Sequence, residues 1–509
     1  MRLTDRSDNL VGIGARREDT MEWVGDGRYE ASLESLAARS APTWFGDAKF
    51  GIFVHWGLFS VPGFAPRGSY ADALRDDYGH AMTRNPYAEQ YMNMMRDPGG
   101  PTADYHRRHF GDLPYEGFKA LFEEGLKQWS AEEWAETFHR AGARYIVMVT
   151  KHHDGFALWP TKVRNPHRSD WFTERDLVGE LAAAVRKRGM RFGVYYSGGI
   201  DWTFQTKVVK TLGDYIYTPH ASGYPRYADA QVRELITRYQ PDILWNDISW
   251  PTGQKQLFSL FADYYNTVPD GVVNDRWQTA TWGRKVMRSK LARAGFDLLM
   301  KQLIKAKQDF LHSAPPPVLP HSDFTTREYA RFDTTQTRKW EATRGIGNSF
   351  GFNRNETEVD HASFEQELFP AFADTVAKNG NLLLNVGPSG GAGVIPAAQL
   401  SRLTAFGDWL RVNGSAIYGT HPYDEPQGET VDGLPVRTTS GGGAVNVVVI
   451  GYPRGREVVV KGLALPGSAG TLLADGSPVT VGRQGGDAVL GFSRDLDSIY
   501  SPAVAIPLS

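Results

Sequence analysis

Residues 44–57 read WFGDAKFGIFVHWG. The short apolar run from Phe50 to Val54 predicts a buried strand, which ends on His55 and Trp56 before a glycine. A strand that carries an imidazole and an indole to such an end is typical of a pocket floor. Aromatic walls with a few fixed polar groups suit a sugar or another small ring. A core strand with one hydrogen-bonded histidine explains this segment equally well, but the pattern recurs along the chain, which favours the pocket.

Five further segments repeat the design, in which an amphipathic helix precedes a short apolar strand and polar or aromatic residues follow it. The first helix is predicted over residues 130–141, with Ser130 as N-cap and Glu133 at the capping-box position. The other helices are predicted at 176–188, 227–239, 256–265 and 369–378. The strands are predicted at 145–149 before Lys151-His152-His153-Asp154-Gly155, 191–196 before Ser197-Gly198-Gly199, 243–245 before Asn246-Asp247, 272–273 before Asn274-Asp275-Arg276, and 381–387.

Apolar strands that alternate with helices indicate an α/β fold with a parallel sheet. The polar residues follow the strands, which is typical of a (β/α)8-like, TIM-type barrel with its site at the carboxyl ends. A doubly wound sheet is disfavoured because no G-x-G-x-x-G motif follows a strand. Beyond about residue 420, short alternating runs separated by glycine-rich turns predict a C-terminal antiparallel β-sandwich. We therefore expect a catalytic barrel over residues 1–418, with a helical insertion at about 278–322, and the sandwich over 419–509.

Composition narrows the function further. The chain has 509 residues, a formal net charge of -2 and no cysteine. Near-balanced charge gives no reason to expect nucleic acid or an anionic membrane as a partner. The absence of cysteine excludes a disulfide scaffold, a thiolate metal site and a cysteine nucleophile. Neither an apolar leader nor a run of about 20 apolar residues is present, so a cytoplasmic location is the expectation.

A basic stretch interrupts the repeat. Residues 284–311 form a helical pattern rich in lysine and arginine. We expect a solvated helical insertion. A lid over the pocket and a subunit contact are the alternatives, and exposed leucine and phenylalanine side chains leave homo-oligomerisation open. Nucleic-acid binding is disfavoured because the basic face has few aromatic side chains that could stack on bases.

Polar and aromatic residues at the strand ends should converge on the barrel mouth, where two chemistries compete. Metal binding is disfavoured because the histidines and carboxylates lack a convincing ligand spacing. In a sugar site, histidines and an arginine would donate hydrogen bonds to hydroxyls, and two carboxyl groups about 5 Å apart would perform retaining hydrolysis. Asp247, at a strand end, suits a nucleophile, whereas Glu89, Glu328 and Glu341 remain open as its partner. The converging residues are His55, His152, His153, Tyr195, Trp245, Asp247 and Arg276.

The ordered set of motifs resembles the α-L-fucosidases of glycoside hydrolase family 29, from about Trp44 to about Gly419. The motifs are Lys49 to Gly57 with Ser60-Val61-Pro62, Lys151 to Phe156, Gly193 to Ser197, Leu244 to Asp247, Asn274 to Trp277, Asp323 to Tyr329, Trp340-Glu341, Ser349 to Phe352 and Gly380 to Pro388.

The resemblance implies a barrel with a C-terminal β-sandwich, a retaining mechanism on a fucosylated oligosaccharide or glycoside, and no metal or organic cofactor. It makes Asp247 the nucleophile and Glu328 the acid/base. It assigns the remaining residues to sugar binding: His55, His152, His153, Tyr195 and Arg276 at the hydroxyls and the nucleophile, Trp245 and Phe350 at the fucose methyl group, and Glu89 at the sugar.

The chain departs from the family pattern in three places. Gln90 stands where the family usually has an aromatic residue, and the segments 72–85 and 278–322 look expanded. A non-catalytic protein that binds fucosylated glycans and a metal-dependent barrel hydrolase remain as alternatives. The sequence does not specify the fucosyl linkage.

Overall fold

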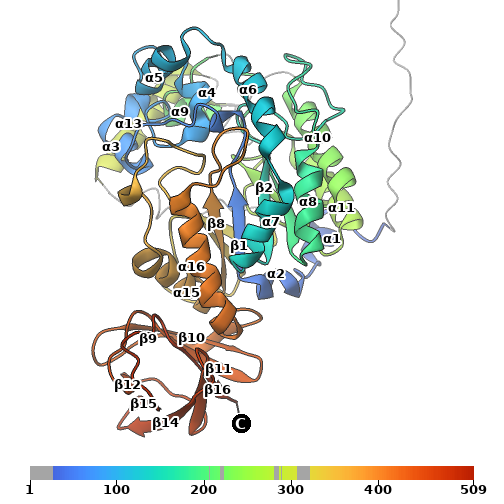
Figure 1. Cartoon of the computed structure of the whole chain (residues 1–509). Coiled ribbons are helices and arrows are strands. Elements are labelled where there is room, and N and C mark those ends of the chain that lie inside the picture. Colours follow the sequence, from blue (N-terminus) through green and yellow to red (C-terminus); the bar gives the residue numbers. More distant parts are fainter. Residues whose placement is uncertain are drawn as a thin grey trace, which may run out of the picture.

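The computed structural model describes residues 27–205, 207–217, 223–279, 286–287, 289–306 and 321–508. Eight parallel strands form a barrel-like sheet in the order β5-β4-β3-β2-β1-β8-β7-β6, and a second, antiparallel sheet follows it in the chain (Figure 1). The TIM-type architecture with a C-terminal antiparallel domain is therefore confirmed. The barrel strands are β1 (Phe50–Val54), β2 (Tyr145–Lys151), β3 (Arg191–Ser197), β4 (Ile243–Asp247), β5 (Val272–Val273), β6 (Thr325–Glu328), β7 (Trp340–Gly345) and β8 (Gly380–Val386).

Helices surround this sheet, and their ends follow local sequence signals. In α7 the hydroxyl of Ser130 accepts a hydrogen bond from the Glu133 backbone N–H at 3.3 Å, as the capping pattern predicts. Helix α10 begins earlier than predicted because Pro225 suits the first helical turn, where no backbone N–H is needed. The principal helices are α1 (Leu33–Ala37), α2 (Thr43–Ala48), α3 (Tyr70–Asp76), α4 (Tyr91–Met94), α5 (Pro101–Phe110), α6 (Phe118–Gly125), α7 (Ala131–Arg140), α8 (Leu177–Lys187), α9 (Leu212–Tyr217), α10 (Tyr224–Tyr239), α11 (Gln254–Thr267), α13 (Lys290–Ala306), α15 (Phe369–Ala377) and α16 (Ala397–Asn413).

The barrel closes between β5 and β6 through a few residues next to these strands, among them Asp323, Asp275 and Arg276. Among the described residues these two strands share no ladder. Instead, the Asp323 backbone N–H donates to the Val273 carbonyl at 2.9 Å, and the Asp323 carboxylate accepts from the Val273 N–H at 2.7 Å. Arg39 forms a buried ion pair with the same carboxylate at 2.5 Å. The seam beside β6 is thus held chiefly by side-chain contacts.

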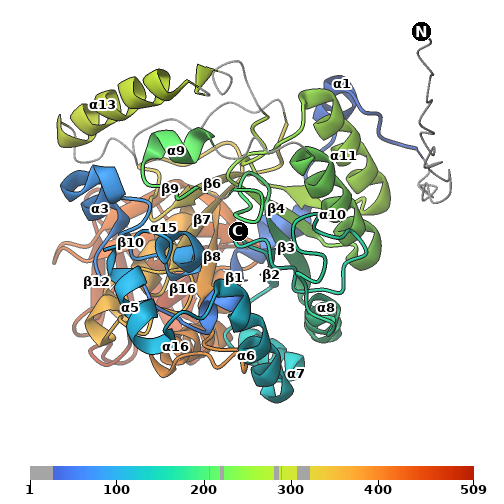
Figure 2. The same cartoon turned by 90° about the horizontal axis from the view of Figure 1, so that it is seen from above.

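Three helices gather at the barrel mouth, at the end away from the C-terminal sheet (Figures 1 and 2). Helix α3 occupies part of the expanded 72–85 segment, and α13 makes up most of the described part of the basic insertion. Much of α13 is solvent-exposed, as predicted, but Ile304 and Met300 pack into an apolar cluster with residues of α3 and α9. The Asp297 carboxylate on α13 also accepts hydrogen bonds from Tyr78 at 2.9 Å and Thr211 at 2.8 Å. The described part of the insertion therefore supports the elements beside the mouth; residues 280–285, 288 and 307–320 lie outside the described residues.

The C-terminal strands form one continuous antiparallel sheet that curls around its own apolar core. A bridge between Thr430 and Val460 brings its two ends together, so the core is enclosed by a single sheet instead of two stacked ones. An ion pair of 2.7 Å between Arg437 and Asp374 of α15 joins the two units. The strands are β9 (His421–Glu429), β10 (Pro435–Gly441), β11 (Ala444–Val449), β12 (Glu457–Val460), β13 (Ala469–Leu472), β14 (Pro478–Gln484), β15 (Asp487–Phe492) and β16 (Ala503–Pro507).

A search of the described helices for a long apolar segment able to span a bilayer finds none.

Candidate active site

One pocket at the carboxyl ends of the barrel strands contains every site residue that the sequence predicted. Because parallel strands end at the same edge of the sheet, residues distant in sequence meet there. His152 and His153, which would face opposite sides within a strand, both reach the pocket because β2 ends at Lys151. The predicted residues that line it are His55, Glu89, His152, His153, Tyr195, Trp245, Asp247, Arg276, Glu328 and Phe350.

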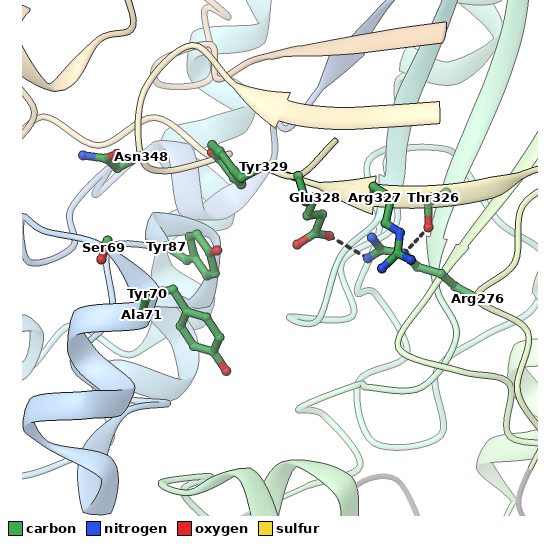
Figure 3. A pocket seen from close by; sticks show the side chains of 11 residues that line it. Ser69, Tyr70, Ala71, Tyr87, Arg276, Thr326, Arg327, Glu328, Tyr329 and Asn348 are labelled. Atoms are coloured by element: carbon green, nitrogen blue, oxygen red, sulfur yellow. Dashed lines mark hydrogen bonds and ion pairs between the residues drawn. The ribbon is translucent and has the colours of Figure 1, made fainter. Parts of the chain in front are cut away.

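Arg276 holds two carboxylates close together. Its Nη1 atom lies 3.0 Å from Asp247 Oδ1 and 2.6 Å from Glu328 Oε1 (Figure 3 shows the contact with Glu328). The two carboxylate oxygens therefore cannot be more than 5.6 Å apart (3.0 Å plus 2.6 Å). This upper limit is compatible with the separation of about 5 Å found in retaining glycosidases and lies below the roughly 6.5 Å or more of inverting ones.

Asp247 is fixed from several sides. Its Oδ2 atom accepts a hydrogen bond from the Tyr195 hydroxyl at 2.8 Å, and its Oδ1 atom accepts one from the Ile248 backbone N–H at 3.0 Å. Ile248 has a φ of 61°, which is unusual for a β-branched residue and typical of a strained functional turn. The turn packs against Gly199, where an added Cβ would lie 1.8 Å from the Ile248 carbonyl oxygen. The carboxylate is thus held rigidly in the pocket.

Arg276 is itself held from behind. Its Nε atom donates to the Thr326 hydroxyl at 3.0 Å, and that hydroxyl donates to Asp275 at 2.7 Å. Burial alone would lower the pKa of Arg276, but the nearby charges of Glu328, Asp247 and Asp275 raise it above its ordinary value. The guanidinium therefore remains a permanent positive charge between the two carboxylates.

Two of the histidines that line the pocket have their Nδ1 atoms hydrogen-bonded within the protein. The Asn385 side-chain amide donates to the Phe350 carbonyl at 2.7 Å, so its oxygen faces His55 Nδ1 at 2.6 Å and that nitrogen carries the hydrogen. The Ser197 hydroxyl donates to the Ile200 carbonyl at 2.8 Å and therefore accepts from His153 Nδ1 at 2.6 Å.

Burial lowers the pKa of both His55 and His153 to about 3, so both rings are neutral near pH 7. In each ring Nε2 is then an acceptor. The sequence predicts that these two histidines donate to hydroxyls. With their Nδ1 hydrogens bonded to Asn385 and Ser197, they would instead accept hydrogen bonds from the hydroxyls of a ligand.

His152 contributes an unsatisfied polar atom. Its buried Nδ1 has no hydrogen-bond partner among the described residues, and its ring stacks on Tyr195 with centroids 5.5 Å apart. A buried polar atom without a partner is costly unless a ligand satisfies it. A polyhydroxylated ligand fits this need.

The other glutamates considered from sequence have different surroundings. Glu341 lies beneath the pocket wall, where it accepts hydrogen bonds from Trp245 Nε1 at 3.0 Å and the Tyr145 hydroxyl at 2.7 Å. Glu89 lines the pocket but accepts from the Gly351 backbone N–H at 2.8 Å. Burial raises the pKa of both carboxyl groups to about 7. Only Glu328, of the three, contacts the guanidinium that holds Asp247.

The buried Glu341 predicts a pH-dependent stability. Its folded-state pKa lies above the unfolded value, so its contribution to stability is full below about pH 4.5 and is lost as the pH rises through about 7. We expect Glu341→Gln, which mimics the protonated acid, to flatten the fall in melting temperature between pH 6 and pH 8. Thermal unfolding of both proteins at the two pH values tests this, and an unchanged fall in the variant would contradict it.

Several pocket residues were not predicted. Tyr70, from α3, and Tyr215, from α9, line the mouth from the helices that pack beside it. Gln90, which replaces the family's usual aromatic residue, is buried in the pocket wall and accepts from the Asn85 amide at 3.2 Å. Tyr87 could have been found from its place two residues before Glu89, but no local pattern marks Tyr70 or Tyr215. The full set of unpredicted lining residues is Phe53, Tyr70, Met82, Tyr87, Gln90, Tyr215, Ile248 and Thr343.

A family model described as α-L-fucosidase matches residues 19–415. The chain belongs to the α-L-fucosidase family. It is 32% identical over 436 residues to the human tissue α-L-fucosidase, a match that covers 84% of this chain and 79% of the relative. It is 30% identical over 455 residues to an α-L-fucosidase of Branchiostoma floridae, covering 87% of this chain and 86% of the relative.

Solved structures of fucosidases have the same architecture. The crystal structure of the Thermotoga maritima α-fucosidase is 40% identical to this family member, with a TM-score of 0.77, and the match covers 94% of this chain and all of the other (100%). A structure of the Thermotoga fucosidase in complex with fucose has the same TM-score at 39% identity and the same coverage. Membership of the family disfavours a metal-dependent barrel hydrolase.

Proposed function

We propose that this chain is a retaining exo-glycosidase that releases L-fucose from fucosylated oligosaccharides or glycosides, with Asp247 as nucleophile and Glu328 as acid/base. One observation carries the proposal: a single Arg276 nitrogen contacts both carboxylates and limits their oxygens to a separation suited to retention. Membership of the α-L-fucosidase family supports the choice of sugar. A protein that only binds glycans would not need this pair.

In the first step, Asp247 Oδ attacks the anomeric carbon of the fucoside. The bond between that carbon and the glycosidic oxygen breaks, and Glu328 gives its proton to the departing oxygen. A fucosyl ester on Asp247 forms with inverted configuration. Arg276 stays between the two side chains. It stabilises the Asp247 carboxylate before the attack and the Glu328 carboxylate after Glu328 has given its proton.

In the second step, Glu328, now ionised, takes a proton from water. The water oxygen attacks the anomeric carbon, and the ester bond to Asp247 breaks. The second inversion restores the original configuration. Free L-fucose leaves, and both carboxyl groups return to their starting protonation states.

The pocket walls support a 6-deoxy sugar. Trp245 and Phe350 provide apolar surface, and the Trp245 indole N–H already donates to Glu341. A galactoside carries a hydroxyl where fucose carries only hydrogen, and that hydroxyl would lose water without gaining a partner on this wall. We therefore expect discrimination against galactosides.

The configuration of the first product tests the proposal. When an aryl α-L-fucoside is hydrolysed and followed by proton NMR, the α anomer of fucose should appear first, and the β anomer only later by mutarotation. Initial release of the β anomer would contradict retention. Absence of any fucose from aryl and oligosaccharide substrates would favour the glycan-binding alternative.

A further inference from the structure

A second pocket, which we call the outer pocket, adjoins the pocket around Asp247, which we call the fucose pocket. Both are lined by Tyr70, Tyr87, Arg276 and Glu328, but Asp247 lines only the fucose pocket. The acid must reach the glycosidic oxygen, so the leaving group lies on the side of Glu328 away from Asp247. The outer pocket begins at that point. Figure 3 shows tyrosine rings on one side of it and the Glu328–Arg276 contact on the other.

Tyr329, directly after Glu328, is held in an uncommon position. Its φ is 48°, a left-handed conformation that a tyrosine rarely adopts, yet 37% of the residue is exposed. Such strain persists only where the surroundings impose it, and it often marks a functional site.

The Tyr329 ring is fixed by its surroundings. Its hydroxyl accepts from the Gly345 backbone N–H at 3.0 Å and donates to the Gly347 carbonyl at 3.1 Å. An added Cβ on Gly345 would lie 2.7 Å from that hydroxyl oxygen, so the approach depends on glycine. The ring edge also packs on Phe350 with centroids 5.7 Å apart. A rigid aromatic ring that is left partly exposed beside the acid is suited to stacking on a ligand.

Polar side chains complete the outer pocket. Ser69, Arg327 and Asn348 line it together with the three tyrosines. None of these three polar residues lines the fucose pocket. Aromatic rings beside a polar rim match a pyranose, which has one apolar face of C–H groups and a rim of hydroxyls.

We propose that Tyr329 forms a stacking platform for the pyranose ring that leaves when fucose is cleaved, so that this outer pocket selects oligosaccharide substrates. The inference rests on the proposed fucosidase function and extends it to the class of leaving group. Tyr329 acts on the leaving sugar and not on the fucosyl group.

The test compares two substrates of one enzyme. One is the fucosyl-hexose disaccharide that the wild-type protein hydrolyses fastest in a panel of linkages, and the other is methyl α-L-fucoside, whose leaving alcohol also needs the proton of the acid but is not a sugar. We expect Tyr329→Ala to lower kcat/KM for the disaccharide roughly tenfold or more. For the methyl fucoside, kcat/KM should stay within about threefold, which a displaced Glu328 would not allow. Alanine is restricted at a positive φ much as tyrosine is, so the substitution removes the ring without a new backbone demand.

Two variants serve as controls. Tyr329→Phe keeps the ring and should retain more disaccharide activity than Tyr329→Ala. Tyr452→Ala removes an exposed tyrosine that follows β11 in the C-terminal sheet, and should change neither rate. Equal losses on both substrates, or no loss on the disaccharide, would overturn the inference. A wild-type protein that cleaves neither substrate would overturn the proposed function, and the inference with it.

Discussion

Replacing Asp247 with glycine should reduce the turnover of an aryl α-L-fucoside on the order of 10⁴-fold or more, because the covalent intermediate can no longer form. The side chain that is lost accepts hydrogen bonds from Tyr195 and Ile248 and faces Arg276. The space left beside the guanidinium suits a small anion. Azide should therefore restore part of the activity and yield a fucosyl azide of inverted configuration, which measurements of turnover and product identity would detect.

A matched variant separates this effect from damage to the fold. Asp247→Asn keeps the shape of the side chain and a carbonyl oxygen for the Tyr195 hydroxyl, so it should be as inactive as the glycine variant but without rescue by azide. Both variants should unfold at temperatures close to that of the parent. Turnover within a few-fold of the parent would show that Asp247 is not the nucleophile.

Glu328→Ala should reduce hydrolysis of fucosylated oligosaccharides by about 10²- to 10⁴-fold, the usual range for a lost general acid. A sugar is a poor leaving group and needs the proton, whereas a dinitrophenolate leaves without one. Formation of the fucosyl-enzyme from a dinitrophenyl fucoside should therefore be nearly unchanged, and pre-steady-state release of the phenol measures that step directly.

The outcome for Glu328 also depends on the second step. Without the base, water should attack the ester slowly, so the dinitrophenyl substrate should give a burst followed by a slow steady state, and azide should speed the slow phase. An equal loss on oligosaccharide and dinitrophenyl substrates, with no burst, would remove Glu328 as the acid/base.

The strand-end residues were predictable because the signal is local. An apolar run followed at once by a polar residue, as in Trp245 to Asp247, encodes both the strand and the side chain at its end. The parallel arrangement then brings these ends together without further information. This rule accounts for the barrel and for the pocket residues at its strand ends that the sequence predicts.

The remaining features depend on contacts between distant segments. Tyr70 and Tyr215 reach the mouth because α3 and α9 pack beside it, partly through α13, and no pattern near either residue reveals this. The hydrogen positions on His55 and His153 depend on Asn385 and Ser197, so the sequence suggested donors where the fold leaves acceptors. Composition likewise identified the antiparallel C-terminal strands but not their joining into one curled sheet.

The residues alone also left three glutamates open as the partner of Asp247, and only the family resemblance favoured Glu328. The three differ in what surrounds them: Glu341 is enclosed under Trp245, Glu89 is tied to backbone, and Glu328 meets Arg276. Neighbours of this kind are set by tertiary packing, which explains why spacing along the chain could not rank them.

Asp247 and Glu328 end strands that differ in their number of paired neighbours. Asp247 ends a strand with paired neighbours on both sides, whereas Glu328 ends a strand that, in the described part of the barrel, is laddered only to β7. Segments held by fewer backbone bonds open at a lower free-energy cost. Warming should therefore loosen the proton donor while the nucleophile is still in place. Near its upper temperature limit, the protein should first lose its activity on fucosylated oligosaccharides. It should continue to cleave fucosides whose leaving groups need no proton.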